Sequence, residues 1–199
     1  MKTLLFENPG AVGPAELEAD LAALPAWRRE KALSFRFNID RVLSAKAYLL
    51  LQQALREGYG IIEPPEFAFR QNGKPFLRDH PSIHFNLSHC RSGVLCVVDD
   101  SEVGCDIEEV MFDSGLCGEC FCPQEQSRIL SAPVPALEFT RLWTRKEAAL
   151  KLTGEGIAAC GGAAPGLKYL FERPEYAALR IETFADPLGR FVWSVAHLI

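Results

Sequence analysis

The sequence predicts an α+β protein, because helical and strand-like patterns follow one another in each half of the chain. Apolar residues recur at helical spacing over residues 41–57, so we expect a core helix that begins after Asp40, its cap, and ends at Gly58. Short apolar segments with turn residues between them come next. They predict strands at 83–87, 94–98 and 103–107.

The other elements follow from the same periodicities and from turn chemistry. Asn72-Gly73 predicts a tight turn between two extended segments, and Asp186-Pro187-Leu188-Gly189 predicts the turn of a C-terminal hairpin. We therefore expect helices at 16–24, 27–35, 124–130 and 136–152, extended segments at 67–70 and 71–77, a Gly- and Cys-rich loop at 115–123, and a hairpin of 179–184 with 191–196. We place the joint between two domains, 1–100 and 101–199, near residues 99–103.

The composition and charge of the sequence exclude some classes of protein. The 199 residues are 48% hydrophobic, enough for a substantial core, and the longest apolar runs are far shorter than a membrane span. The N-terminal residues lack the apolar core of a signal peptide, so we expect a cytoplasmic protein that does not bind membranes. The net charge of −5 argues against nucleic acid as a partner. Residues 28–46 nevertheless carry six cations and two anions, which suits a small polyanion or an acidic protein.

Seven cysteines, an odd number, are expected to be reduced thiols in a cytoplasmic protein. Three of them, Cys117, Cys120 and Cys122, are close enough in sequence to suggest zinc. A structural zinc site needs four ligands in a recognisable pairing, and no nearby motif supplies the rest. We therefore favour free thiols.

Two carboxylates occur at alternate positions of a predicted strand. Asp106 and Glu108 would leave the strand on the same face, where their oxygens can converge on one cation. Because the candidate ligands are all oxygens, Mg²⁺ is the preferred ion. The alternative is a solvated strand end, since Glu109 continues the acidic run.

A second set of charged residues lies on the predicted helix 136–152. Trp143, Glu147 and Lys151 recur every fourth residue and share a face, whereas Lys146 lies about 100° away from it. A surface salt bridge between Glu147 and Lys151 is the alternative to a site. The helix ends in Thr153-Gly154-Glu155-Gly156, a flexible stop that would let its end approach a ligand.

Three blocks of this sequence resemble a known enzyme family. They are Phe85-Asn86-Leu87-Ser88-His89, Gly104-Cys105-Asp106-Ile107-Glu108, and the stretch WTRKEAALKLTGEG that begins at Trp143. In order and wording they are similar to the signature blocks of 4′-phosphopantetheinyl transferases of the surfactin-synthetase-activating type. The resemblance spans roughly residues 27–156. It implies two similar α+β subdomains packed as a pseudo-dimer, with the active site in the cleft between them.

The resemblance also implies a reaction. Such enzymes transfer the 4′-phosphopantetheine of coenzyme A to a serine of an apo acyl or peptidyl carrier protein, with Mg²⁺, or Mn²⁺ in its place, and release adenosine 3′,5′-bisphosphate. Asp106, Glu108 and Glu147 would hold the metal ion. Glu147 would also take the serine proton, directly or through water, and Lys151 would neutralise or protonate the departing phosphate. Two fused halves would make a monomer self-sufficient.

Further residues acquire coenzyme A-binding roles from the resemblance. Ser88 and His89 would bind the pyrophosphate, although a histidine at a strand end is by itself more often a polar cap. Lys146 would lie at the pantetheine end. Lys74, in Gly73-Lys74-Pro75, would contact the nucleotide.

The 3′-phosphate is expected to bind in the basic N-terminal segment, because a doubly charged group favours a pair of cations. Lys31 and Arg41 fall where the family places these cations, and Arg28 and Arg36 are competing choices.

The chain departs from the family pattern in three respects: it is somewhat short, the Cys-rich stretch at 115–122 is unfamiliar, and Cys90 and Cys105 replace residues that are usually small or hydroxylated. Three other functions stay open: a coenzyme A-binding regulatory protein without transfer activity, a Mg²⁺-dependent hydrolase of coenzyme A or a nucleotide, and a structural interaction module. The choice of carrier protein lies in surface shape, which no motif encodes.

Overall fold

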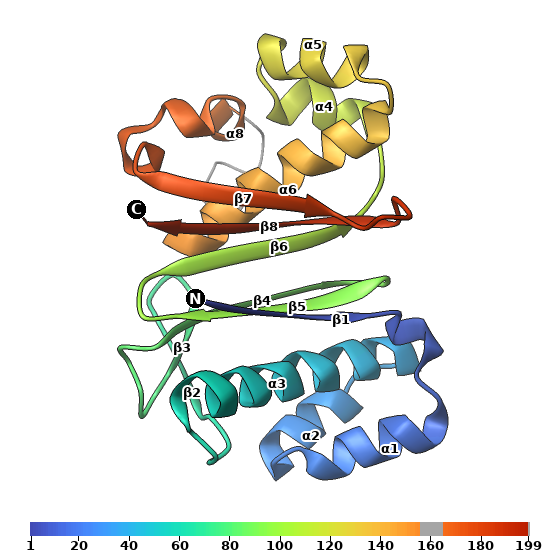
Figure 1. Ribbon diagram of the computed structural model, residues 1–199, viewed down its shortest axis with the longest axis vertical. Helices are drawn as coiled ribbons and strands as arrows, with labels where there is room; N and C mark the ends of the chain where they lie inside the picture. Colours follow the sequence, from blue (N-terminus) through green and yellow to red (C-terminus); the bar gives the residue numbers. More distant parts are fainter. Residues whose placement is uncertain (156–164, 199) are drawn as a thin grey trace.

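Two three-stranded antiparallel sheets lie between two layers of helices in the computed structural model, which describes residues 1–155 and 165–198 (Figure 1). The N-terminal half contains β1 (Lys2–Glu7), the 3₁₀ turn Pro9–Ala11, α1 (Pro14–Ala23), α2 (Ala26–Leu33), α3 (Asn38–Tyr59), β2 (Phe67–Phe69), β3 (Pro75–Leu77), β4 (His84–Cys90) and β5 (Gly93–Asp99). The C-terminal half contains β6 (Val103–Glu109), α4 (Ser114–Cys120), α5 (Pro123–Ser131), α6 (Pro135–Thr153), α8 (Pro165–Lys168), the 3₁₀ turns Leu170–Glu172 and Pro174–Tyr176, β7 (Leu179–Ala185) and β8 (Phe191–Leu198).

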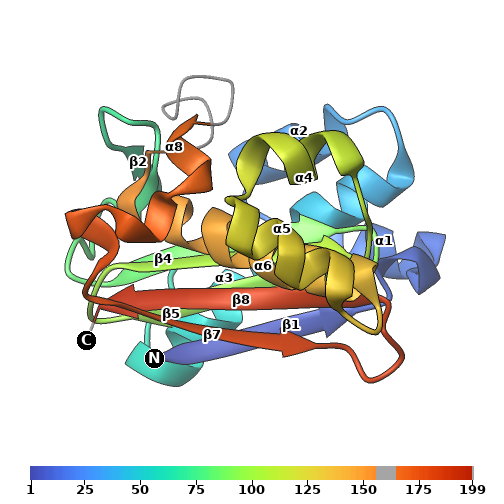
Figure 2. The ribbon, with the colours of Figure 1, turned by 90° about the horizontal axis from the view of Figure 1, so that it is seen from above.

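The two sheets have the strand orders β1-β5-β4 and β6-β8-β7, and β2 pairs with β3 in a separate hairpin. Helix α3 covers the first sheet and α6 covers the second, lying over β8 in Figure 2. Strand β5 shows how the layers join: Cys96 and Val98 pack with α3, whereas Leu95 and Val97 pack against β6 and β8. The prediction of an α+β protein is therefore confirmed.

Strands β4 and β6 lie side by side where the two sheets meet, but side chains make the hydrogen bonds there. The backbone amide of Cys105 donates to Asn86 Oδ1 at 2.9 Å, and that of Ile107 donates to Ser88 Oγ at 3.4 Å. From the first bond to the second, the residue number rises by two on both strands, so β4 and β6 run parallel where they meet. Asn86 and Ser88 thus join the halves, a role that no sequence pattern indicated.

Several predicted boundaries need correction. The core helix begins at Asn38 after Phe37, so Asp40 lies in its first turn and is not its cap. It continues through Gly58 and ends at Tyr59, and Gly60 follows as its C-terminal cap with a φ of +69°. Glycine accepts a positive φ without the steric penalty of a Cβ, which explains the true end.

The prediction of a Gly- and Cys-rich loop at 115–123 is wrong. Residues Ser114–Cys120 form α4, because Asp113 caps it by accepting a hydrogen bond from the Leu116 amide at 2.9 Å. Cys117 and Cys120 are buried on the same side, three residues apart. Strand β1 was not predicted either, and it takes its conformation from pairing with β5.

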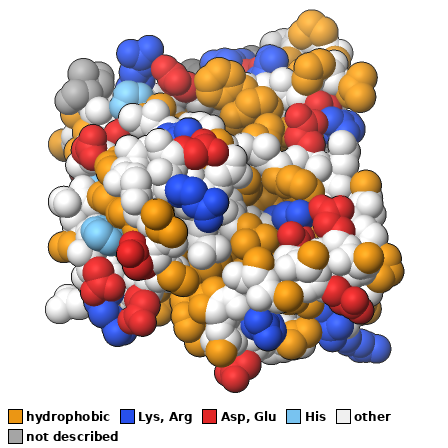
Figure 3. Space-filling model, turned by 60° about the horizontal axis from the view of Figure 1, so that its bottom comes forward, with side chains coloured by type: hydrophobic (Ala, Val, Ile, Leu, Met, Phe, Trp, Pro, Cys, Tyr) orange, Lys and Arg blue, Asp and Glu red, His pale blue; other side chains and the backbone are white. Residues whose placement is uncertain are grey.

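Figure 3 turns the α1–α2 side of the molecule forward and shows Lys and Arg side chains interspersed with Asp and Glu among apolar groups. In the described part of the chain, no helix combines the length and the apolar character that a membrane crossing requires. Gly156, expected to complete the stop after α6, lies outside the described residues.

Candidate active site

Strand β6 and helix α6 approach each other unusually closely at Gly104. A Cβ at this position would overlap the carbonyl oxygen of Ala148 and the amide nitrogen of Leu152, both in the α6 backbone. Glycine is therefore required here by space rather than by dihedral angle. At this point the backbones of β6 and α6 are in direct contact.

Three carboxylates lie between these elements. Asp106 and Glu108 share the β6 face that carries Gly104, and Glu147 comes from α6. Burial, and to a smaller extent the negative charge of Asp106, raise the pKa of Glu108 to about 7. Burial and Asp106 raise the pKa of Glu147 to about 7 in the same way. We call Asp106, Glu108 and Glu147 the acidic cluster.

Lys151 supplies the nearest positive charge. Its ammonium donates to Asp106 Oδ1 at 2.6 Å and to Ser88 Oγ at 2.9 Å, and Ser88 Oγ donates to the same Asp106 oxygen at 2.9 Å. Burial alone lowers the pKa of Lys151, but the charge and hydrogen bond of Asp106 outweigh it, so the pKa is raised. Lys151 is thus a stable cation at this position.

The acidic cluster retains unused bonding capacity. Asp106 is 2% exposed, and its Oδ2 is a buried oxygen without a hydrogen-bond partner among the described residues. A buried carboxylate oxygen without a partner is costly, and a cation removes that cost. The all-oxygen donor set fits a hard ion such as Mg²⁺. Within residues 1–155 and 165–198, however, no three His, Cys, Asp or Glu side chains are gathered closely enough to hold a metal ion.

A cationic cavity of about 240 Å³ lies between α2, α3 and the end of β4. Arg28, Lys31 and His89 line it together with Phe35, Asp40, Ser44 and Ala47. Desolvation lowers the pKa of His89, and among the nearby cations Lys151 lowers it most. The structure thus brings His89 and Lys31 together, as a shared anion site requires.

Arg28, rather than Arg41, completes this cavity. One terminal nitrogen of Arg28 donates to the Ser44 carbonyl at 2.9 Å, while its buried Nε has no partner among the described residues. Arg41 is directed elsewhere: its Nε donates to the Phe35 carbonyl at 2.9 Å and its NH1 to Asn38 at 3.3 Å. Arg36, the other competing choice, is exposed and lies over the Phe37 ring.

A larger cavity of about 430 Å³ shares Arg28 with the cationic cavity. Its lining comes from the β2–β3 hairpin, β4 and the end of α6, and it includes Arg28 and Lys151. Apolar walls are provided by Phe67, Phe69, Phe85 and Leu150. A ligand in this cavity therefore has access to Arg28 of the N-terminal half and to Lys151, whose ammonium pairs with Asp106 of the acidic cluster.

Two predicted ligand-binding lysines are committed to internal bonds. Lys74 is 7% exposed and Lys146 is 1% exposed. The Lys146 ammonium donates to the carbonyls of Cys120 at 3.1 Å and Leu167 at 2.6 Å, and pairs with Glu125 at 2.8 Å. Lys146 therefore holds α4, α5 and α8 together, and the structure does not bring it to the acidic cluster.

The cysteines form no disulfide among the described residues. Cys117 and Cys120 are buried and Cys122 is half-buried, and burial raises the pKa of the Cys117 and Cys120 thiols. A raised pKa disfavours the thiolate that zinc binds.

Comparison with known proteins gives consistent matches. Residues 102–174 match the family model described as the 4′-phosphopantetheinyl transferase superfamily. The chain is 40% identical over 135 residues to 4′-phosphopantetheinyl transferase psf-1 of Bacillus pumilus, which covers 66% of this chain and 58% of that protein. It is 31% identical over 159 residues to a 4′-phosphopantetheinyl transferase of Bacillus subtilis, covering 77% and 69%. With HetI of a Nostoc species the identity is 38% over 112 residues, covering 51% and 47%. The chain thus spans less than two thirds of the length of psf-1 and of HetI.

Proposed function

This chain belongs to the 4′-phosphopantetheinyl transferase superfamily, as its three sequence blocks predicted, and on that premise we propose that it transfers 4′-phosphopantetheine from coenzyme A to a carrier-protein serine. The serine oxygen forms a bond to the pantetheine-bearing phosphorus as the bond from that phosphorus to the bridging oxygen breaks. Adenosine 3′,5′-bisphosphate leaves with the electron pair. Such a reaction depends mainly on positioning and charge stabilisation, so it needs no covalent enzyme intermediate.

The observation that carries this proposal is the buried, unpartnered oxygen of Asp106 beside two carboxyls with raised pKa values. Asp106, Glu108 and Glu147 would hold Mg²⁺, or Mn²⁺ in its place. When bound, the ion supplies positive charge to the pyrophosphate oxygens. The pKa of about 7 for Glu147 also suits a general base at neutral pH, where it can accept the serine proton.

Cations of the chain are proposed to bind the other charges of coenzyme A. Lys151, which lines the large cavity, would neutralise charge on the leaving group, and Ser88 and His89 would contact the pyrophosphate. For the 3′-phosphate, the cationic cavity supports Lys31 paired with Arg28 in place of Arg41. The unpartnered Nε of Arg28 supplies a free donor for that phosphate.

We also propose that the halves 1–100 and 101–199 are two similar subdomains forming a pseudo-dimer, with the site in the cleft between them. Each half places one long helix on a three-stranded antiparallel sheet, α3 in the first and α6 in the second, which supports this division. The large cavity takes its lining from both halves. The carrier partner, a monomeric state and a cytoplasmic location remain predictions.

The test incubates the purified chain with coenzyme A, Mg²⁺ and a panel of apo carrier proteins, and measures the mass of each carrier. We expect the mass to increase by one phosphopantetheine. Glu147→Gln should slow the transfer by roughly 10²–10⁴-fold, the contribution of a general base. Glu18→Gln is the matched control, because Glu18 is exposed on α1 and forms no ion pair among the described residues.

Two results would contradict the proposal. Transfer by Glu147→Gln at the wild-type rate would remove Glu147 from the chemistry. Release of phosphopantetheine with no carrier present, and no transfer when carriers are added, would identify a hydrolase.

A further inference from the structure

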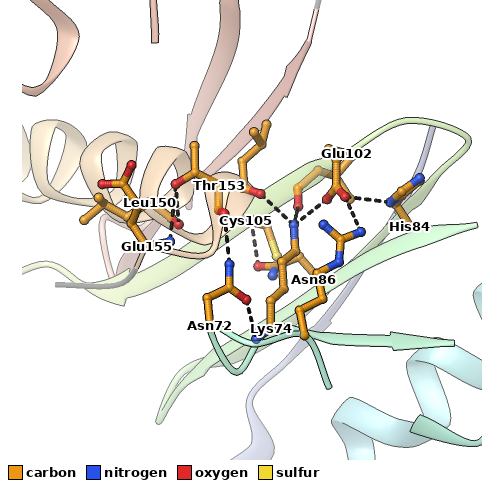
Figure 4. A network of polar contacts seen from close by, with 12 residues as sticks. Asn72, Lys74, His84, Asn86, Glu102, Cys105, Leu150, Thr153 and Glu155 are labelled. Carbon is orange, nitrogen blue, oxygen red and sulfur yellow. Dashed lines mark hydrogen bonds and ion pairs between the residues drawn. The ribbon is translucent and has the colours of Figure 1, made fainter. Parts of the chain in front are cut away.

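The ammonium group of Lys74 lies at a junction between the two halves of the molecule (Figure 4). It donates to Glu102 Oε2 at 2.7 Å, to the Val103 carbonyl at 3.0 Å and to the Leu152 carbonyl at 2.7 Å. A lysine ammonium has three donors, and all three are in use. With Lys74 only 7% exposed, any contact between this amine and a ligand would first require breaking one of these bonds.

Two of the three acceptors belong to the elements that carry the acidic cluster. Val103 begins β6, three residues before Asp106, and Leu152 follows Lys151 in the last turn of α6. Carbonyls in the last turn of a helix lack partners within the helix and carry partial negative charge, so a cation is favourable there. One amine from the β3 end of the hairpin therefore holds β6 and α6 together.

Asn72 makes a second attachment from the same hairpin. Its Nδ2 donates to the Thr153 carbonyl at 3.3 Å, and its Oδ1 accepts from the Lys74 amide at 3.1 Å. Gly154 follows with φ +77°, and a side chain there would overlap Asn72. The hairpin thus contacts two successive carbonyls at the end of α6.

The third acceptor, Glu102, is itself held in place. It pairs with Arg70, and with His84 Nδ1 at 3.1 Å. Burial raises the pKa of Glu102, but Lys74 outweighs burial and the pKa is lowered, so the carboxylate stays charged. We call Lys74, Asn72 and Glu102 the Lys74 clamp.

We propose that Lys74 is a positioning residue: its amine fixes the elements that carry the acidic cluster relative to the hairpin wall of the large cavity and does not contact the ligand. This inference rests on the proposed function, and it revises the nucleotide contact that the family resemblance implied. Residues 72–75 still line the cavity. The clamp therefore links the cavity wall to the elements that carry the chemistry.

The variant Lys74→Met keeps the length of the side chain and removes the donors. We expect kcat to fall about 10–100-fold, since a displacement of about 1 Å in a site has effects of this size. The Mg²⁺ concentration for half-maximal rate should rise as well. The Kd for adenosine 3′,5′-bisphosphate, measured by calorimetry, should change less than about threefold. A tenfold weaker nucleotide affinity with unchanged kcat at saturating coenzyme A would overturn the proposal.

Two further variants complete the design. Glu102→Gln should lower kcat less than Lys74→Met, and the double variant should be no worse than Lys74→Met alone, because both act on one unit. Additive losses would contradict a shared clamp. Arg78→Met is the matched control, since Arg78 follows the same hairpin and pairs only with the exposed Glu66 among the described residues.

Hydrogen–deuterium exchange separates failure of this inference from failure of the proposed function. Amides of residues 103–105 and 150–155 should exchange faster in Lys74→Met and in Glu102→Gln, whether or not any carrier is modified. Unchanged exchange in both variants would refute the clamp. If Lys74→Met does not fold, Glu102→Gln and Asn72→Ala carry the same measurements.

Discussion

The acidic cluster and the Lys74 clamp each centre on one buried charged residue at the contact of β6 with α6, Asp106 and Lys74, yet they differ in how completely that residue is bonded. In the clamp, every donor of the Lys74 ammonium has an acceptor. In the acidic cluster, one Asp106 oxygen has no hydrogen-bond partner among the described residues, and two carboxyls have pKa values of about 7. The difference indicates two uses of buried charge. Charged groups whose hydrogen-bonding atoms all have partners stabilise the fold, whereas charged groups with an atom left without a partner can bind a ligand.

The same contrast occurs among the arginines. Arg28 keeps a buried nitrogen without a partner in the described part of the chain, whereas Arg41 bonds Phe35 and Asn38. Arg28 lines both cavities. Bonding capacity thus distinguishes residues that a linear motif treats as equivalent.

Gly104→Ala should have the largest effect, because it separates α6 from β6 and disturbs both groups at once. The added Cβ meets backbone atoms, which cannot move aside as a flexible side chain does. We expect a loss of about 3 kcal/mol or more in the free energy of unfolding, the upper range for overpacking, measured by urea denaturation. Gly118→Ala is the control, with open space around its Cβ inside α4, and should stabilise the protein by about 0.5–1 kcal/mol. Equal effects of the two variants would contradict the close contact.

A pair of Glu→Gln variants should sharpen the comparison, with opposite effects on the stability of the metal-free protein at pH 8. Glu102→Gln removes an ion pair of the clamp and should cost about 1–3 kcal/mol. Glu108→Gln removes a buried charge next to Asp106 and should raise the melting temperature.

The raised pKa values of Glu108 and Glu147 also make the stability of the protein depend on pH. Between about pH 4.5 and 7 the native state keeps protons on Glu108 and Glu147 that the unfolded chain has lost, so their contribution to stability falls as pH rises. The lowered pKa of His89 acts in the opposite direction. The difference between wild type and Glu108→Gln isolates the glutamate, and a smaller decline with pH is expected in the variant. A steeper decline would contradict the assignment.

The periodicity of apolar residues and the turn residues were sufficient to predict much of the fold. The helix 41–57 and the hairpin 179–196 were predictable because their periodicities coincide with the faces that are buried. Strand β1 was not, because its extended conformation depends on β5, about ninety residues later. The α4 helix was missed because two glycines obscured the signal of Asp113 and the spacing of Cys117 and Cys120.

The site divides in the same way. The period of two in β6 and the period of four in α6 are the local signals behind Asp106, Glu108, Glu147 and Lys151, whose roles in the site stay predictions. The burial of Lys74 and Lys146 is a tertiary property, set by carbonyls up to 78 residues away. No local motif reports it, so the family resemblance assigned both lysines to the ligand.

Proton release on Mg²⁺ binding tests most directly whether the acidic cluster is a metal site. Calorimetry of Mg²⁺ binding in buffers of different ionisation enthalpy gives the number of protons released. With two carboxyls at a pKa of about 7, more than one proton should leave at about pH 6 and fewer than half of one at about pH 8.5. Glu108→Gln should remove roughly half of the release. Mg²⁺ binding without proton release at the lower pH, or release unchanged by Glu108→Gln, would contradict the account.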